Sequence, residues 1–147
     1  MSEQFRTGKV EKRYWAVVEK APQPKHGRCV DRLVRADRQR KVRVVGQHDG
    51  PEEGQDAALE YRTLRVLPFG ALVEVLLLTG RKHQIRAQLA SRGWWIVGDK
   101  KYGAKSRFPL GIALHGRSLT LEHPVSHETL EIVAPLPATW QVLGVDP

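Results

Sequence analysis

Short segments of the chain alternate apolar and polar residues, which is the pattern of β-strands that bury one face. Residues 58–68 place apolar or aromatic side chains at alternate positions, and the apolar stretch 71–79 follows Phe69-Gly70 as the second strand of a hairpin would. Further segments rich in β-branched and aromatic residues predict strands at 12–20, 41–47, 114–124 and 128–137, with a turn at 123–128 between the last two.

One segment has a helical spacing instead. Residues 82–91 place Ile85 and Leu89 four positions apart, and Gly93 stands where such a helix would end. Because strands outnumber helices and most connections suit hairpins, we predict an α+β fold with a largely antiparallel, mixed sheet and few helices. The length of 147 residues suits one domain, which we assign to residues 1–147.

The charge of the chain points to a particular kind of partner. The formal net charge is +8 at pH 7 and the isoelectric point is about 10.0. This balance favours nucleic acid as the partner, although a basic surface kept for solubility gives the same composition. Residues 28–43 hold seven basic residues against two aspartates, and we expect an exposed, irregular segment there.

Several classes of protein are excluded by the same sequence. Cys29 is the only cysteine, so the chain forms no internal disulfide and no cysteine-based zinc site. The six histidines show no metal-ligand spacing in a helical context, and we predict no metal. The first fifteen residues lack the apolar core of a signal peptide, and no apolar run is long enough to span a membrane. We therefore expect a cytoplasmic protein without membrane contact.

A dense group of polar side chains lies where a predicted strand meets the predicted helix. Five bulky polar or basic residues follow one another within six positions: Arg81, Lys82, His83, Gln84 and Arg86. A helix N-terminus favours anions, and Lys82 and Arg86, four apart, would share one helix face. This arrangement suits contact with a phosphate backbone. The alternative is a solvated helix end whose arginine pairs with a local carboxylate such as Asp99, which we expect in a turn.

The same stretch resembles a known family. The string "TGRKHQIRAQLASRGWWIVGDKKYG" is similar to the T-G-R-x-H-Q-I/L-R and G-D-x-x-Y-G signature of the RNA pseudouridine synthases of the RluA class. Three further segments resemble that family in the same order: "FRTGKVEKRYWAVV", "DAALEYRTLRVL" (with Leu59 in place of the usual threonine) and "ALHGRSLTLEHPVSHETLEIVAPLP". The resemblance therefore spans nearly all of the chain.

The resemblance implies an enzyme that isomerises uridine in ribosomal or transfer RNA to pseudouridine, with no cofactor and no metal. Tyr14 takes the place of the family's tyrosine, which packs on the target uracil and is a candidate for removing the C5 proton. Arg86 takes the place of the arginine that pairs with the catalytic aspartate. The residues that we assign to RNA binding, by direct contact or by supporting the cleft wall, are Arg81, Lys82, His83, Gln84, Arg28, Arg32 and Arg35.

One catalytic group of the family has no counterpart here. The nucleophilic aspartate of the family lies in an H-R-L-D-x-x-T-S-G motif well before the tyrosine, whereas no aspartate precedes Tyr14 in this chain. Residues 30–37, "VDRLVRAD", resemble H-R-L-D superficially, but they follow Tyr14 and lack the T-S-G, so we do not assign Asp31 as the nucleophile. Without a carboxylate held by Arg86, the site could bind RNA but not cleave the glycosidic bond.

The chain resembles the C-terminal portion of the family's catalytic domain, with the N-terminal strands of the family fold missing. We expect either a natural truncation or a fragment of a longer protein. Such a chain would leave a sheet edge or an apolar face uncovered, so we expect it to self-associate or to pair with a second chain. Three interpretations stay open: part of a pseudouridine synthase, a catalytically inactive relative that binds structured RNA through the same cleft, and a degenerate gene product.

Overall fold

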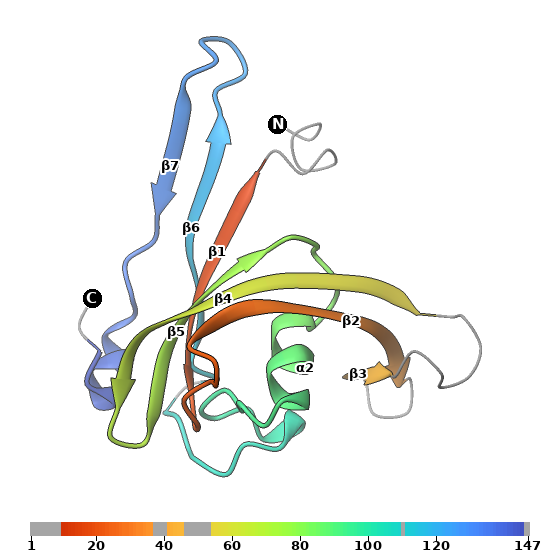
Figure 1. Cartoon of the computed structure of the whole chain (residues 1–147). Coiled ribbons are helices and arrows are strands. Elements are labelled where there is room, and N and C mark those ends of the chain that lie inside the picture. The colour runs from red at the N-terminus through yellow and green to blue at the C-terminus, as the bar shows by residue number, and fades with distance from the viewer. Residues whose placement is uncertain (1–9, 37–40, 46–53, 110, 146–147) are drawn as a thin grey trace.

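The computed structural model describes residues 10–36, 41–45, 54–109 and 111–145, and its strands form one seven-stranded sheet (Figure 1). The order across the sheet is β3-β2-β4-β5-β1-β6-β7, and each neighbouring pair is antiparallel. The strands are β1 (Glu11–Val18), β2 (His26–Ala36), β3 (Lys41–Val45), β4 (Gln55–Leu67), β5 (Gly70–Leu77), β6 (Leu114–Glu122) and β7 (Thr129–Val133). The helices described with them are α2 (Gln84–Ser91) and the 3₁₀ helices η2 (Lys100–Tyr102) and η3 (Ala138–Leu143). The predicted α+β class with a largely antiparallel sheet is confirmed.

The basic segment is the main difference from the predicted strands. The expectation of an irregular stretch at residues 28–43 is wrong for the residues described, because β2 and β3 pair there as an antiparallel hairpin. Leu33 and Val42 are buried in a small apolar cluster that also contains Ala87 of α2. Few apolar residues suffice for this packing, since alternate side chains of a strand reach the same face. The loop at 37–40 lies outside the described residues.

Helix α2 begins at Gln84 rather than at Lys82. His83 precedes it with φ 53°, in the left-handed region that a right-handed helix does not contain. Lys82 therefore lies in the turn before the helix, and the prediction that Lys82 and Arg86 share one helix face is wrong. Gly93, at φ 79°, follows the last turn as predicted, because glycine adopts this region without strain.

The sheet is covered in part on each face, by α2 on one and by η3 on the other. Successive β1 residues point to opposite faces, so Tyr14 lies on the α2 face and Trp15 on the η3 face. His115, the neighbour of Trp15 in β6, contacts Trp140 of η3, with the ring centroids 6.2 Å apart. Each face therefore presents a different set of side chains.

Strand β7 forms one edge of the sheet and is exposed along its whole length. Leu130, Ile132 and Val133 are 37%, 56% and 50% exposed, whereas Val17 in the central strand β1 is fully buried. Figure 1 shows β6 and β7 extending as a ribbon beyond most of the sheet. An edge strand of this kind offers unpaired backbone groups and apolar side chains to another strand.

Candidate active site

Tyr14 and Arg86, the two residues assigned to catalysis, line one hollow of about 230 Å³ on the α2 face of the sheet. Tyr14 comes from β1, beside Gly116 of β6, where an added Cβ would lie 3.6 Å from the tyrosine ring. Arg86 comes from the first turn of α2. The other residues of the wall are Leu77, Arg81, His83, Gln84, Ile85 and Leu114. The strand–helix junction and the tyrosine strand thus meet at one place.

A buried carboxylate of the chain holds Arg86. The Nε–H of Arg86 donates to Oδ2 of Asp99 at 2.9 Å, and Nη2 donates to Oδ1 at 2.8 Å. The side chains are 19% and 2% exposed, respectively. Tyr102 lies against the guanidinium, with 4.8 Å between Cζ and the ring centroid. The hydrogen bond to Asp99 is the main cause that raises the pKa of Arg86, so the guanidinium stays charged.

The ion pair with Asp99 uses only two of the three guanidinium nitrogens of Arg86. A guanidinium presents five N–H donors, and Asp99 accepts one from Nε and one from Nη2 of Arg86. Nη1 takes no part in this bidentate contact. The local pairing that the sequence offered as an alternative to function is therefore present, and it is compatible with binding a second anion.

Gln84 supports the junction through its side-chain amide, which is the supporting one of the two roles expected for it. Its Oε1 accepts hydrogen bonds from Thr79 Oγ1 at 2.8 Å and from the backbone N–H of Arg81 at 3.0 Å. Its Nε2 donates to the carbonyl of Ala58 at 3.0 Å. The residue is 2% exposed, so its bonded amide has no surface to offer to a ligand.

The other residues of the junction differ in their surroundings. Arg81 lines the hollow, and its Nε donates to the carbonyl of Asp56 at 2.9 Å. Lys82 is exposed. Nδ1 of His83 lies 2.9 Å from the hydroxyl of Tyr102. The predicted wall thus contains an exposed lysine, a partly buried arginine and a histidine that contacts Tyr102.

The surroundings of His83 favour its neutral form. Burial is the largest cause that lowers its pKa from the ordinary value of 6.5, and the cations Arg86, Lys101 and Lys82 lower the pKa further. A neutral imidazole presents one donor and one acceptor, whereas a protonated one presents two donors. The protonation state of His83 therefore decides which hydrogen bonds it can form.

Asp31 has a structural role. Its carboxylate accepts hydrogen bonds from Nη1 of Arg92 at 2.7 Å and from Nε2 of Gln88 at 2.8 Å. It is absent from the residues that line the hollow of Tyr14 and Arg86. This geometry supports the decision not to assign Asp31 as the nucleophile.

The three arginines assigned to RNA binding in β2 do not form one surface. Side chains alternate along the strand, so Arg28 and Arg32 point to one face and Arg35 to the other. Arg35 shares its face with Leu33, which packs against α2. Arg28 is 60% exposed and lies 3.9 Å from a carboxylate oxygen of Glu60. Of the three, Arg35 is on the face that carries the hollow.

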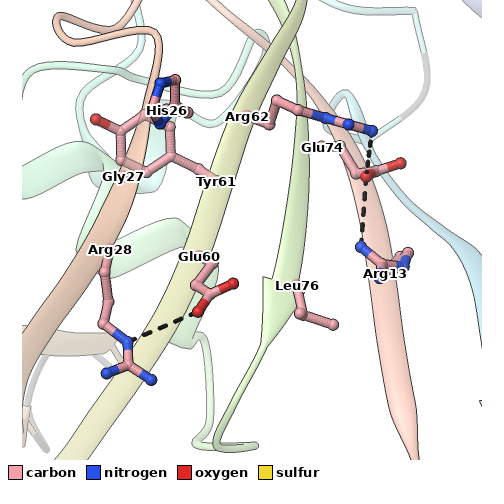
Figure 2. A pocket seen from close by; sticks show the side chains of 9 residues that line it. All are labelled: Arg13, His26, Gly27, Arg28, Glu60, Tyr61, Arg62, Glu74 and Leu76. Carbon is pink, nitrogen blue, oxygen red and sulfur yellow. Dashed lines mark hydrogen bonds and ion pairs between the residues drawn. The ribbon is translucent and has the colours of Figure 1, made fainter.

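A larger hollow, of about 750 Å³, lies on the opposite face of the sheet (Figure 2). Glu74 is one of the residues that line it and accepts hydrogen bonds from Nη2 of Arg62 at 3.1 Å and from Nε1 of Trp15 at 3.2 Å. Nη1 of Arg13 approaches the same carboxylate at 3.5 Å. Opposite charges on neighbouring strands stabilise a sheet in this way, so we interpret this hollow as an ion-pair ladder and place the candidate site on the α2 face.

Other kinds of chemistry find little support in the part of the chain that the structure describes. There, no group of three or more histidine, cysteine, aspartate or glutamate side chains could hold a metal ion. Cys29 is buried, and its burial raises the pKa of the thiol to about 11. None of the described helices is long and apolar enough to cross a membrane.

Two solved human structures share this fold. The chain aligns with RNA pseudouridylate synthase domain containing 4 at a TM-score of 0.75 and 28% identity, covering 97% of this chain and 66% of that one. It aligns with RNA pseudouridylate synthase domain containing 1 at a TM-score of 0.76 and 25% identity, covering 92% and 58%. The antiparallel sheet with few helices is therefore a pseudouridylate synthase fold.

Sequence comparisons lead to the same family. A model of the RNA pseudouridylate synthase family matches residues 1–91. An uncharacterized RNA pseudouridine synthase of Chlorobaculum parvum is 31% identical over 160 residues, which cover 97% of this chain and 49% of the relative. The ribosomal large subunit pseudouridine synthase D of Zymomonas mobilis is 30% identical over 153 residues, which cover 97% and 47%. The chain belongs to the RNA pseudouridylate synthase family and spans about half the length of these relatives.

Proposed function

We propose that the chain is the C-terminal portion of the catalytic domain of an RNA pseudouridine synthase of the RluA class. The observation that carries the proposal is the meeting of Tyr14 and Arg86 in one hollow. The class is supported by two motifs, T-G-R-x-H-Q-I-R and G-D-x-x-Y-G, which supply Arg86 and its partner Asp99.

The proposed reaction isomerises a uridine in RNA. The N-glycosidic bond breaks, the uracil turns within the site, and its C5 forms a bond to C1′ of the ribose. The proton lost from C5 is balanced by one gained at N1. Tyr14 packs on the uracil and receives the C5 proton, and the charged Arg86 holds the nucleophilic carboxylate near the sugar. Asp99 keeps that guanidinium in place through the bidentate pair.

We propose that the nucleophilic carboxylate is not one of these 147 residues. Asp31 is bound by Arg92 and Gln88, and Asp99 is bound by Arg86. Neither aspartate lines the hollow of Tyr14 and Arg86, and Asp99 is only 2% exposed, so neither is placed to attack a sugar carbon there. The same observation favours the alternative function, a catalytically inactive relative that binds RNA through the cleft.

RNA is the proposed partner, in the cytoplasm, where ribosomal and transfer RNA are found. Arg81 and Arg86 line the hollow, Lys82 is exposed beside it, and Arg35 lies on the same face. Cations arranged around a cleft contact the phosphate backbone and release counterions, so RNA binding should weaken as salt is raised.

A pseudouridine assay on bulk ribosomal and transfer RNA tests the function, using the 147-residue protein and its Arg86→Ala and Asp31→Ala variants. We expect no product from this chain alone. RNA binding should weaken with salt and fall about tenfold in Arg86→Ala, the loss for one charged hydrogen bond. Arg13→Ala, on the opposite face, is the matched control and should retain binding. Product that disappears in Asp31→Ala would identify Asp31 as the nucleophile, and absence of RNA binding would exclude the RNA role.

Self-association through β7 is the second part of the proposal. The exposed apolar residues of this edge strand include Ile132, which is 56% exposed. Light scattering at micromolar concentration should show a dimer or larger species, and Ile132→Lys should reduce it. Val142→Lys, at an apolar residue of η3 that is 67% exposed, is the control. A monodisperse monomer would contradict the proposal.

A further inference from the structure

Tyr102 connects Arg86 to the β2–β3 hairpin. Its hydroxyl accepts the backbone N–H of Val42 in β3 at 3.0 Å and lies 2.9 Å from Nδ1 of His83. The rings of His83 and Tyr102 meet edge to face, with centroids 5.8 Å apart and an interplanar angle of 81°. One side chain from η2 therefore contacts the arginine, the residue before α2 and a backbone amide of β3.

We propose that Tyr102 is a positioning residue for Arg86, and that His83 holds Tyr102 in place. The backbone N–H of Val42 can only donate, so the Tyr102 hydroxyl accepts there. We assign the hydroxyl proton to Nδ1 of His83, which places the imidazole proton on Nε2. The inference rests on the proposed function only in taking Arg86 as the arginine of the site.

The contacts of Tyr102 and Asp99 complement one another. Asp99 binds two nitrogens at one edge of the guanidinium, and Cζ of Arg86 lies over the Tyr102 ring, 4.8 Å from its centroid. The contact with Asp99 alone allows the guanidinium to tilt, and the contact with the ring limits this tilt. Together they restrict Arg86 to one orientation, which is the preorganisation that a binding or catalytic site requires.

Protonation of His83 would remove the acceptor of the Tyr102 hydroxyl proton, because a protonated imidazole presents two donors and no acceptor. Burial and nearby cations lower the pKa of His83 below 6.5, so the anchored form is present at neutral pH and lost in acid. The charged groups around His83 and Tyr102 are Arg81, Lys82, Arg86, Asp99, Lys101 and Lys41.

NMR of the full chain tests the inference without RNA. The nitrogen shifts of His83 locate its imidazole proton, which we expect on Nε2 at pH 7. Solvent exchange of the Arg86 guanidinium protons is measured relative to those of Arg92, whose ion pair with Asp31 is an internal reference. The intrinsic pH dependence of exchange largely cancels in this ratio. The ratio should rise as the pH falls through the pKa of His83.

Two variants of Tyr102 distinguish the contribution of its ring from that of its hydroxyl. Tyr102→Phe keeps the ring but removes the hydroxyl. Its exchange ratio should rise about fivefold at pH 7, as expected for one lost hydrogen bond. The ratio should also no longer change when His83 is protonated. Tyr102→Leu also removes the ring and should raise the ratio further. Tyr61→Phe is the control, since the hydroxyl of Tyr61 binds the carbonyl of Pro24 instead.

Two results would overturn the inference. The first is an imidazole proton on Nδ1 of His83 at pH 7. The second is an exchange ratio in Tyr102→Phe or Tyr102→Leu equal to that of the parent. Neither measurement uses RNA binding or product formation, so a failure of the inference is distinguishable from a failure of the proposed function.

Discussion

Asp99 binds Arg86 through two parallel hydrogen bonds, of 2.9 and 2.8 Å, from a position that is 2% exposed. The fork of the guanidinium matches the two oxygens of the carboxylate, which makes this geometry specific as well as stable. The pair joins the first turn of α2 to the turn before η2. The G-D-x-x-Y-G motif is therefore a support for the arginine, because it contributes both Asp99 and Tyr102.

Removing the charge of Asp99 should destabilise the fold. Asp99→Asn leaves Arg86 partly buried without a counter-ion, and we expect the free energy of unfolding in urea to fall by about 3 kcal/mol. The exposed pair of Arg13 and Glu11 provides the control, since Glu11→Gln should change stability by less than about 0.5 kcal/mol. Equal effects of the two variants would contradict a structural role for the Asp99 pair.

The stability of the protein should fall in mild acid because of His83. The pKa of His83 is lowered in the folded state, so the unfolded state binds the proton first as the pH falls. The free energy of unfolding should decrease by this route as the pH falls through 6.5, the ordinary pKa of histidine. Urea unfolding at a series of pH values measures the slope. His83→Gln should reduce the slope relative to the parent protein, and an unchanged slope would contradict this prediction.

Cys29 should resist thiol reagents in the folded protein. It is fully buried, and its pKa is raised to about 11, so only about one thiol in a thousand is ionised at pH 8. Modification by a disulfide reagent at pH 8 should be slow without denaturant and fast in concentrated urea. Rapid modification of the native protein would show that β2 opens locally from β4.

The strand pattern predicted most of the sheet because alternation is a local property. Strand β2 was missed because its alternation is hidden: Cys29 and Leu33 are buried on the α2 face, but Asp31 stands between them. A partly buried aspartate that is hydrogen-bonded to Gln88 and Arg92 looks like a surface residue in the sequence. The position of Asp31 on this face therefore depends on partners that are distant in the sequence.

The candidate site was likewise predictable from the sequence only in part. The resemblance supplied Tyr14 and Arg86, and the structure places them in one hollow. The burial of Gln84 and the left-handed conformation of His83 depend on how β5 enters the helix, which no local spacing shows. The support of Arg86 by Tyr102 requires the turn at η2 to fold back on α2, and this too is a property of the tertiary structure.

Gly70, at the β4–β5 turn, lies close to the backbone at the end of β1. A Cβ built at Gly70 would lie 1.8 Å from the carbonyl oxygen of Val18 in β1, and backbone atoms of Val18 and Glu19 lie within 3.1 Å. Gly70→Ala must therefore displace β1 or β5, and we expect it to reduce the free energy of unfolding by about 3 kcal/mol. Gly80→Ala is the matched control, because the nearest atom to its Cβ would be Nζ of Lys12, at 3.8 Å; its effect should stay within about 0.5 kcal/mol. Chemical denaturation of the parent protein and the two variants measures these changes. An unchanged midpoint for Gly70→Ala would show that the backbone of β1 has room for a Cβ at this position.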